Sequence, residues 1–187
     1  MTHRTEKEKM IAGELYQAYD EELVKDRQNT RRLLQEYNDS PAENSKLRRD
    51  LLRRLLGGLG GNIEIEPPFR CDYGYNIHVG DYFYANFNCV ILDCAPVRIG
   101  THVFLGPNVQ IYTATHPLVP AQRNSGLEFA KPITIEDNVW IGGGVIINAG
   151  VTIGEGTTIG SGSVVTKDIP PNVLAAGNPC RVIREIG

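Results

Sequence analysis

The chain has 187 residues, enough for one domain with an appendage and a sizeable hydrophobic core. Its net charge of −3 argues against a surface that binds nucleic acid or an anionic membrane. The four cysteines show no CxxC pair or zinc-type spacing, and the polar first nine residues resemble neither a signal peptide nor a membrane span. We therefore expect a cytoplasmic protein with reduced thiols.

Residues 1–60 form the first predicted unit, a helical segment. Apolar residues recur at helical spacing from about Lys7 to Leu56, which predicts two or three short helices packed against the following domain. The apolar faces would carry Ile11, Leu15, Tyr19, Leu33, Leu34, Tyr37, Leu47, Leu51, Leu52 and Leu55. Ser40 and the Pro-Ala-Glu after it have the pattern of a helix start.

Two other features of this segment have simple interpretations. The glycine pairs at 57–58 and 60–61 would end the last helix. The arginine pairs, such as Arg31-Arg32, alternate with leucines and indicate solvated helix faces.

Residues 61–187 form the second predicted unit, organised around a repeat of six between Pro132 and Asp168. A branched apolar residue returns at every sixth position: Ile135, Ile141, Ile147, Ile153, Ile159 and Val165. A second apolar or small residue follows each by four: Val139, Val145, Val151, Thr157, Ser163 and Ile169. This period does not fit an α-helix, but it fits short parallel strands joined by tight turns and stacked as a solenoid. The fold class is therefore mainly β.

The repeat is less regular before residue 132. Coils begin near Cys71, and the pattern is lost between residues 116 and 131, a polar stretch with two prolines. An unpatterned insertion in a regular solenoid is usually functional or a capping arm. Residues beyond Val165 form a C-terminal tail.

His116 is the histidine best placed for catalysis, because it stands where the regular coil gives way to the insertion. A histidine held by a rigid scaffold at a loop mouth is suited to general-base chemistry. From chemistry alone, a structural role is an equal alternative. His78 and His102 fall in repeat turns, where solvated imidazoles are expected, and His3 lies in a terminus expected to fray.

Several other polar residues have two interpretations. Asn86 can be a turn residue or a donor to a developing oxyanion. Asp72, Asp93 and Glu128 can accept from sugar hydroxyls, or be solvated or capping carboxylates. Trp140, the only tryptophan, can pack against a neighbouring subunit or cover a cofactor.

Specific motifs then indicate a family. They are EKEKMIAGELY at residues 6–16, FRCDYGYNI at 69–77, ANF at 85–87, IYTATHP at 111–117, NVWIGG at 138–143, VTKD at 165–168 and GNP at 177–179. Over its whole length the chain resembles the hexapeptide-repeat sugar O-acetyltransferases, most closely the maltose type and slightly less the galactoside type.

The resemblance implies a left-handed parallel β-helix and a homotrimer whose active sites lie between subunits. Acetyl-CoA would be the donor and a small sugar, maltose or glucose, the acceptor, with no metal required. His116 would be the general base for direct attack on the thioester, and Asn86 would stabilise the oxyanion. The acceptor pocket would be lined by Asp72, Tyr84, Asn86, Asp93 and Glu128. The CoA groove would be lined by Trp140, Gly143, Ser161, Thr166, Lys167, Arg181 and Arg184.

The chain departs from the galactoside-type pattern at two positions. Asp72 stands where those enzymes carry Ser, which favours maltose or glucose, and Cys94 stands where they carry a second acidic residue. The alternatives are a galactoside, serine or xenobiotic O-acetyltransferase and a non-catalytic solenoid scaffold. A hexapeptide-repeat carbonic anhydrase is disfavoured, because no His-x4-His pair occurs.

Overall fold

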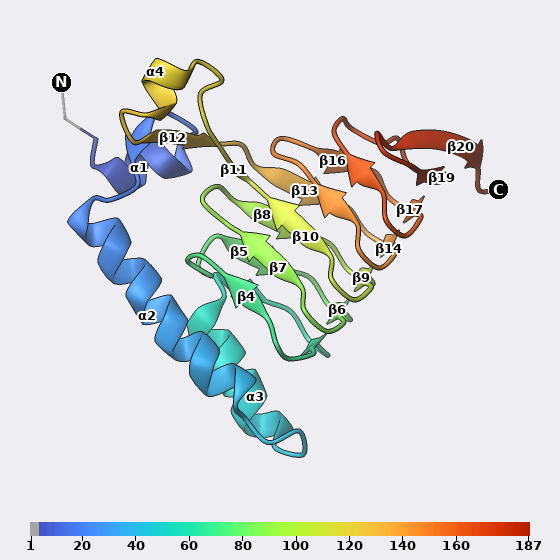
Figure 1. Ribbon diagram of the computed structural model, residues 1–187. Helices are drawn as coiled ribbons and strands as arrows, with labels where there is room; N and C mark the ends of the chain where they lie inside the picture. The colour runs from blue at the N-terminus through green and yellow to red at the C-terminus, as the bar shows by residue number, and fades with distance from the viewer. Residues whose placement is uncertain (1–3) are drawn as a thin grey trace.

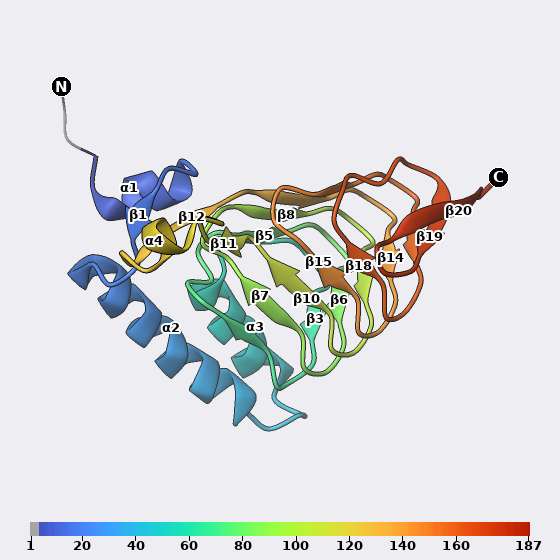
Figure 2. The ribbon, with the colours of Figure 1, turned by 45° about the horizontal axis from the view of Figure 1, so that its top comes forward.

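The computed structural model describes residues 4–187, so the expectation for His3 lies outside the described residues. Figure 1 shows a stack of short parallel strands. Helices α2 (Glu21–Asn38) and α3 (Ser45–Leu55) lie across one end, and a hairpin of strands β19 (Val173–Ala176) and β20 (Arg181–Glu185) lies at the other. The first helix and part of the 116–131 insertion lie together beside the stack, and Figure 2 shows the same arrangement from a second direction.

Three sheets make the faces of the β-helix, and we call them faces I, II and III. Face I consists of β2 (Gly58–Leu59), β5 (Ile77–Val79), β8 (Val97–Ile99), β13 (Ile133–Ile135) and β16 (Thr152–Ile153). Face II consists of β3 (Glu64–Ile65), β6 (Tyr84–Ala85), β9 (Phe104–Leu105), β14 (Trp140–Ile141), β17 (Thr158–Ile159), β19 (Val173–Ala176) and β20 (Arg181–Glu185). Face III consists of β4 (Arg70–Cys71), β7 (Val90–Leu92), β10 (Gln110–Tyr112), β15 (Ile146–Ile147) and β18 (Val164–Val165).

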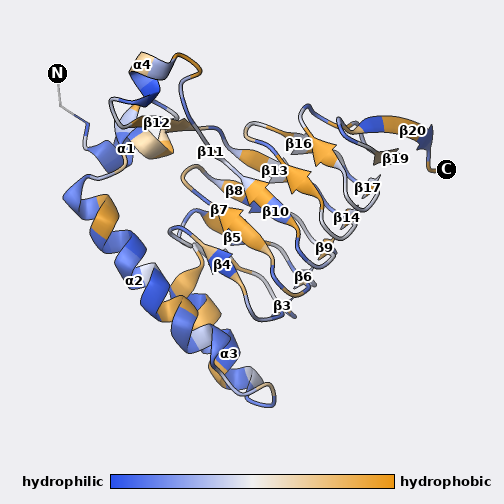
Figure 3. Cartoon of the chain, viewed as in Figure 1, coloured by the Kyte–Doolittle hydropathy of each residue, from blue (hydrophilic) through white to orange (hydrophobic). Residues whose placement is uncertain are grey.

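The six-residue repeat places its branched side chains inside these faces, as predicted. All six residues from Ile135 to Val165 at that spacing are at most 1% exposed. Parallel pairing keeps them in register, with Ile111 opposite Ile147 and Ile147 opposite Val165 on face III. Figure 3 shows the apolar residues of these strands as orange stretches along the coils. The mainly β, parallel β-helix prediction is confirmed.

The first coil begins earlier than predicted, at β2 rather than near Cys71. Gly58 and Leu59 pair with His78 and Val79 of β5, so the glycines near residue 58 belong to the first coil and do not simply end a helix. His78 therefore lies within a strand, and its predicted place in a repeat turn is wrong. A Cβ at Gly57 would lie 1.9 Å from the carbonyl oxygen of Tyr75. Glycine is needed there because the next coil passes in direct contact with the backbone.

The N-terminal segment contains three helices, as predicted, but its apolar face differs near the start. They are α1 (Glu6–Ile11), α2 (Glu21–Asn38) and α3 (Ser45–Leu55). The helical spacing of Ile11, Leu15 and Tyr19 does not define a buried face, because these side chains are 40%, 45% and 82% exposed. Helix α1 ends at Ile11, and Gly13 then turns the chain with φ +76°. In the later helices, Leu34, Tyr37, Leu51, Leu52 and Leu55 are buried, as predicted. The prediction is wrong for Leu47, which is 39% exposed, and Leu33 is only partly buried.

The helix start predicted at Ser40 is wrong by four residues. Helix α3 begins at Ser45, and the side chain of Asn44 caps it by accepting from the backbone N–H of Leu47. Ser40 is buried and donates its hydroxyl to the carbonyl of Tyr37 instead. The Ser40 hydroxyl therefore caps the C-terminal end of α2. The Pro-Ala-Glu pattern after it lies in the turn that connects α2 to α3.

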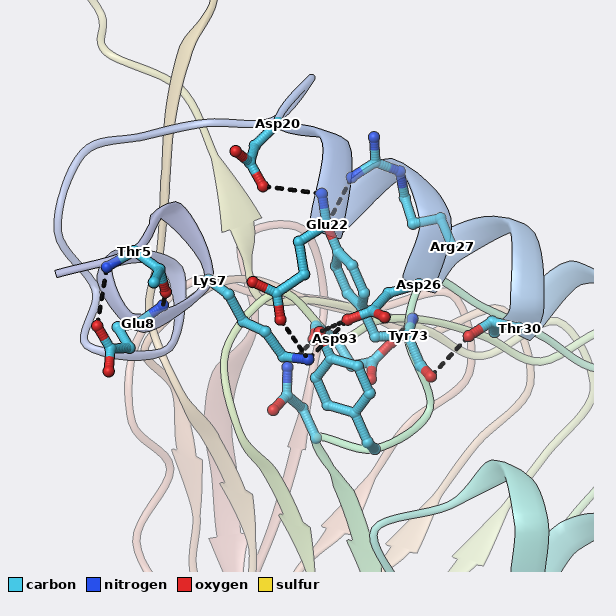
Figure 4. A network of polar contacts seen from close by, with 12 residues as sticks. Thr5, Lys7, Glu8, Asp20, Glu22, Asp26, Arg27, Thr30, Tyr73 and Asp93 are labelled. Atoms are coloured by element: carbon cyan, nitrogen blue, oxygen red, sulfur yellow. Dashed lines mark hydrogen bonds and ion pairs between the residues drawn. The ribbon is translucent and has the colours of Figure 1, made fainter.

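Helix α2 is tied to the coil around Tyr73 by polar contacts, which Figure 4 shows. Arg27 donates to the Tyr73 hydroxyl at 2.6 Å, and Thr30 donates to the Tyr73 carbonyl at 2.8 Å. Lys7 of α1 pairs with Asp26 of α2 at 2.7 Å. These contacts surround a small second core of Met10, Tyr16, Ala18, Leu23, Tyr73, Cys94, Ala95 and Ala130.

A small antiparallel sheet, which we call the cap sheet, joins the N-terminal segment to the 116–131 insertion. Its strands are β1 (Tyr16–Gln17), β12 (Leu127–Ala130) and β11 (Ala114–Thr115), in that spatial order. Helix α4 (Pro120–Arg123) lies between β11 and β12 in the chain. The insertion is therefore ordered by residues more than a hundred positions away.

Throughout residues 4–187, no helix combines the length and apolar character needed to cross a membrane.

Candidate active site

The candidate site residues lie mainly at two corners of the β-helix. We call the edge where face II leads into face III the II–III corner, and the edge where face III leads into face I the III–I corner. Asp72, Asp93 and Thr166 follow strands β4, β7 and β18 directly at the III–I corner. His116 also lies on this side, because β11 continues from β10 with only Thr113 between them.

A cavity of about 440 Å³ opens at the III–I corner, between the coils and helix α2. It is lined by Tyr16, Ala18, Tyr19, Val24, Arg27, Arg31, Asp72, Tyr73, Cys94 and Glu128. Most of these side chains carry hydrogen-bonding or charged groups. We call this space the acceptor cavity.

The Asp72 carboxyl lies at the wall of the acceptor cavity. Burial raises its pKa, and the positive charges of Arg27 and Arg31 act in the opposite direction. The Cys94 thiol lies 3.8 Å from the Asp72 carboxylate oxygen. Burial also raises the pKa of Cys94, to about 12, so this thiol stays neutral and is not an activated nucleophile.

Asp93 lies behind the cavity wall rather than in it. Its side chain is fully buried, and Oδ1 accepts from the backbone N–H groups of Asp72 and Tyr73 at 3.0 and 2.9 Å. Oδ2 is buried without a hydrogen-bond partner in residues 4–187. Burial raises the pKa of Asp93 to about 6. In this structure Asp93 therefore shapes the turn that presents Asp72 and does not itself face the acceptor cavity.

His116 lines a second cavity and lies next to one residue of the acceptor cavity. Its Nε2 is 4.0 Å from Oε1 of Glu128, a residue of the acceptor cavity. The second cavity, about 430 Å³, is lined by Tyr112, Ala114, Thr115, His116, Leu118, Phe129, Lys131, Asn148 and Ala149. The His116 side chain is 53% exposed, so the imidazole is accessible to a substrate.

A separate group of candidate residues lies on face II and at the II–III corner. Tyr84 and Trp140 belong to β6 and β14, and Phe104 pairs with both of them in an outward-facing column. Trp140 is 57% exposed. Gly143 and Ser161 lie two residues after β14 and β17, at successive levels of the same corner.

Asn86 belongs to this II–III group and is partly exposed. Tyr84 and Asn86, both predicted for the acceptor pocket, do not line the acceptor cavity of the same chain. The left-handed turn residue of its coil is Asn88, with φ +62°, so turn geometry does not explain Asn86. The Asn86 side-chain oxygen accepts from the backbone N–H of Phe87 at 2.7 Å. This contact orients the side chain and leaves the amide nitrogen as a donor.

The remaining predicted cofactor residues are exposed. Thr166 and Lys167 lie just after β18 at the III–I corner, and Arg181 and Arg184 lie on β20. No group of three or more His, Cys, Asp or Glu side chains in the described part of the chain is arranged to hold a metal ion.

Sequence reasoning missed five polar residues of the acceptor cavity: Tyr16, Tyr19, Arg27, Arg31 and Tyr73. Arg27 and Arg31 are spaced by four on α2, so they share one helix face, but this spacing is equally typical of a solvated face. Their role depends on where α2 packs, which the pattern does not reveal. Tyr16 has no comparable signal.

Comparison with known proteins supports one family. Residues 9–60 match the maltose acetyltransferase hexapeptide capping motif, and residues 132–167 match the bacterial transferase hexapeptide, with six repeats. A Dictyostelium discoideum protein, named provisionally as an acetyltransferase, is 55% identical over 99% of this chain and 96% of its own length. The chain belongs to the hexapeptide-repeat O-acetyltransferases.

Solved structures of this family match the fold of this chain over almost its whole length. A maltose O-acetyltransferase from Clostridium difficile 630 is 55% identical, with a TM-score of 0.97 and 98% of each chain covered. A galactoside acetyltransferase in complex with coenzyme A is 44% identical, with a TM-score of 0.94, and the match covers 99% of this chain and 92% of that one. The predicted family and enzyme class are confirmed.

Proposed function

We propose that this enzyme transfers the acetyl group of acetyl-CoA to a hydroxyl of a small sugar, with maltose or glucose as the first candidates. The observation that carries the proposal is the position of His116, an exposed imidazole beside a cavity lined by acidic, basic and phenolic side chains. Such a lining can donate to and accept from several hydroxyls at once, as a sugar requires. The family relationship supplies the reaction class.

The chemistry follows direct attack. His116 takes the proton of an acceptor hydroxyl as its oxygen adds to the thioester carbonyl. The C–S bond of the tetrahedral intermediate then breaks, and the CoA sulfur receives the proton from the imidazolium. Cys94, the cysteine of the acceptor cavity, is a buried neutral thiol, which agrees with a mechanism without an acyl-enzyme.

The donor site would extend along face II and the corners of the later coils. Trp140 would cover part of the CoA molecule, and Gly143 and Ser161 would let it approach the backbone. Thr166, Lys167, Arg181 and Arg184 would contact its phosphate-bearing portion, where cations and hydroxyls suit anionic oxygens. The coenzyme A complex of the galactoside acetyltransferase supports this assignment.

A homotrimer would complete the site. Asn86 and His116 lie at opposite edges of face III within one chain, because Asn86 precedes β7 and the insertion follows β10. If Asn86 stabilises the oxyanion that His116 helps to form, the two residues come from adjacent subunits. The exposed aromatic column that includes Tyr84 and Trp140 is suited to such packing.

The acceptor assignment rests on the acceptor cavity. Asp72 and Glu128 would accept from sugar hydroxyls, while Arg27 and Arg31 would donate to sugar oxygens. Asp93 would act indirectly, by fixing the backbone of Asp72. A galactoside or xenobiotic acceptor is the alternative, and acceptor ranking distinguishes them.

The test is thiol release from acetyl-CoA with maltose, glucose, a galactoside, serine and chloramphenicol as acceptors. His116→Ala should lower sugar-dependent release by about 10² or more, the scale of a general base. His102→Asn is the matched control, because His102 lies on the outer surface stacked on Tyr82 and has a left-handed backbone that asparagine tolerates. Full activity of folded His116→Ala protein would refute the assignment of the base.

Subunit mixing tests the shared site. Trimers assembled from His116→Ala and Asn86→Ala chains should recover part of the activity, because some interfaces then combine two intact residues. Absence of recovery in verified mixed trimers would count against a site that Asn86 and His116 share across an interface.

A further inference from the structure

Glu128 lies between a buried tyrosine and His116. The hydroxyl of Tyr16 donates to Oε2 of Glu128 at 3.0 Å, while Oε1 faces Nε2 of His116 at 4.0 Å. The Glu128 side chain is 25% exposed, about half the exposure of His116. The carboxylate is therefore held from the protein side and presents its other oxygen to the imidazole.

Strand pairing in the cap sheet places Tyr16, Glu128 and His116 next to one another in this order. Tyr16 of β1 stands opposite Glu128 of β12, and Phe129 of β12 stands opposite Thr115 of β11. His116 directly follows Thr115. The cap sheet thus connects the N-terminal segment to the candidate base through two adjacent strand pairs.

Tyr16 is suited to be a permanent donor in this arrangement. Its side chain is fully buried in the second core, and burial raises its pKa far above the working range. The phenol stays protonated and neutral, so one Glu128 oxygen is always occupied.

We propose that Glu128 is a positioning residue for His116, and that Tyr16 of the N-terminal segment holds Glu128 in place. The proposal deepens the proposed function and rests on His116 as the base. At 4.0 Å the carboxylate is too far for a neutral hydrogen bond, but it stabilises the imidazolium that forms when His116 takes the acceptor proton. The N-terminal segment therefore contributes to the rate of the chemical step, in addition to capping the β-helix.

Glu128→Gln is the first test, because glutamine keeps the size of the side chain and can still accept from Tyr16 and from a sugar hydroxyl, while the negative charge is removed. We expect kcat to fall by about 10- to 100-fold, between the factors for an exposed and a buried ion pair, with the acceptor KM changed by less than about threefold. A residue that only binds the acceptor would instead raise KM and leave kcat nearly unchanged.

Tyr16→Phe is the second test, and Tyr75→Phe is its matched control. Both changes delete a phenol that donates to a carboxylate, Glu128 for Tyr16 and Asp26 at 3.1 Å for Tyr75, and both rings pack in the N-terminal core. Tyr16→Phe should lower kcat by roughly 3- to 10-fold, as expected when one hydrogen bond is lost. Tyr75→Phe should leave kcat unchanged. Equal losses in the two variants would mean that only packing was affected.

Two double-mutant cycles decide the mechanism. In a Glu128→Ala background, Tyr16→Phe should have no further effect on kcat, because Tyr16 acts through Glu128. In a His116→Ala background, assayed at high enzyme concentration, Glu128→Gln should likewise add no loss. Additive effects in the Tyr16–Glu128 cycle overturn the proposal, and this cycle does not depend on the residual rate of His116→Ala.

The outcomes separate this inference from the proposed function. If His116→Ala abolishes sugar acetylation while Glu128→Gln leaves kcat unchanged, the function stands and the positioning role is wrong. If His116→Ala is fully active, the assignment of the base fails first, and any Glu128 effect belongs to acceptor binding.

Discussion

The buried carboxyl of Asp93 should make the stability of this protein depend on pH in a direction opposite to that of most carboxylates. Asp93 is fully buried, one of its oxygens has no partner, and burial raises its pKa from the ordinary 3.8 to about 6. Because the folded protein binds this proton more tightly than the unfolded chain, the favourable contribution is complete below about pH 3.8. It is lost as the pH rises through 6.

The magnitude follows from the same pKa values. Each pKa unit corresponds to ~1.4 kcal/mol, so a rise from 3.8 to about 6 corresponds to about 3 kcal/mol lost between low pH and pH 8. Asp93→Asn removes the titration and keeps an oxygen that can accept from the N–H groups of Asp72 and Tyr73. Relative to the wild type, the free energy of unfolding of the variant should therefore rise by about 2–3 kcal/mol on going from pH 4 to pH 8, because at pH 4 the unfolded chain is already partly deprotonated.

The assay is chemical or thermal unfolding of both proteins at pH 4, 5, 6, 7 and 8, at one protein concentration. Titrating groups that do not interact with Asp93 cancel in the difference between the two proteins, so the difference reports Asp93 together with its coupling to Asp72. A difference in the free energy of unfolding between the two proteins that stays constant from pH 4 to pH 8 would refute the reasoning. It would mean that Asp93 titrates equally in the folded and unfolded states.

Two further predictions concern the β-helix. Ile147→Ala should lower the free energy of unfolding by about 2–5 kcal/mol, because the side chain is fully buried in the face III column. Ile183→Ala, at a 61% exposed position, should change it by no more than about 0.5 kcal/mol. Denaturant unfolding measures both variants, and equal effects would contradict the assigned register. Gly57→Ala should strongly reduce folded yield, because its Cβ would lie 1.9 Å from the Tyr75 carbonyl oxygen, while Gly61→Ala makes contact only at 3.4 Å and should fold normally. Normal folding of Gly57→Ala would show that the first coil is not held as described.

The helical segment shows where local patterns mislead. In α2 and α3 the apolar spacing matched the buried faces except at Leu47 near the start of α3, since these helices are long enough to cover the end of the β-helix with one stripe. In residues 12–20 the same spacing failed, because Gly13 ends α1 and β1 then pairs with a strand more than a hundred residues away. Long-range pairing overrode the local preference there.

In the candidate site, too, the sequence predicted the position of some residues and not of others. His116 and Glu128 were predicted as site residues from the chemistry of their residue types and from the family resemblance, and the structure places them 4.0 Å apart. Asp93 was expected in the acceptor pocket, but its carboxyl caps backbone N–H groups behind the wall. A carboxylate has the same appearance in the sequence whether it faces a cavity or the backbone.

The repeat of six determined by itself that this chain forms a parallel β-helix, because each period specifies one inward side chain and one turn, and both are local properties. The motifs around residues 69–77, 111–117 and 138–143 were sufficient to indicate the family. Tertiary structure alone decided that Tyr16 meets Glu128, that Arg27 enters the acceptor cavity, and that Asn86 and His116 lie at different corners. These relations join segments far apart in the chain, and their geometry depends on how the coils stack and where α2 packs, which no local period encodes.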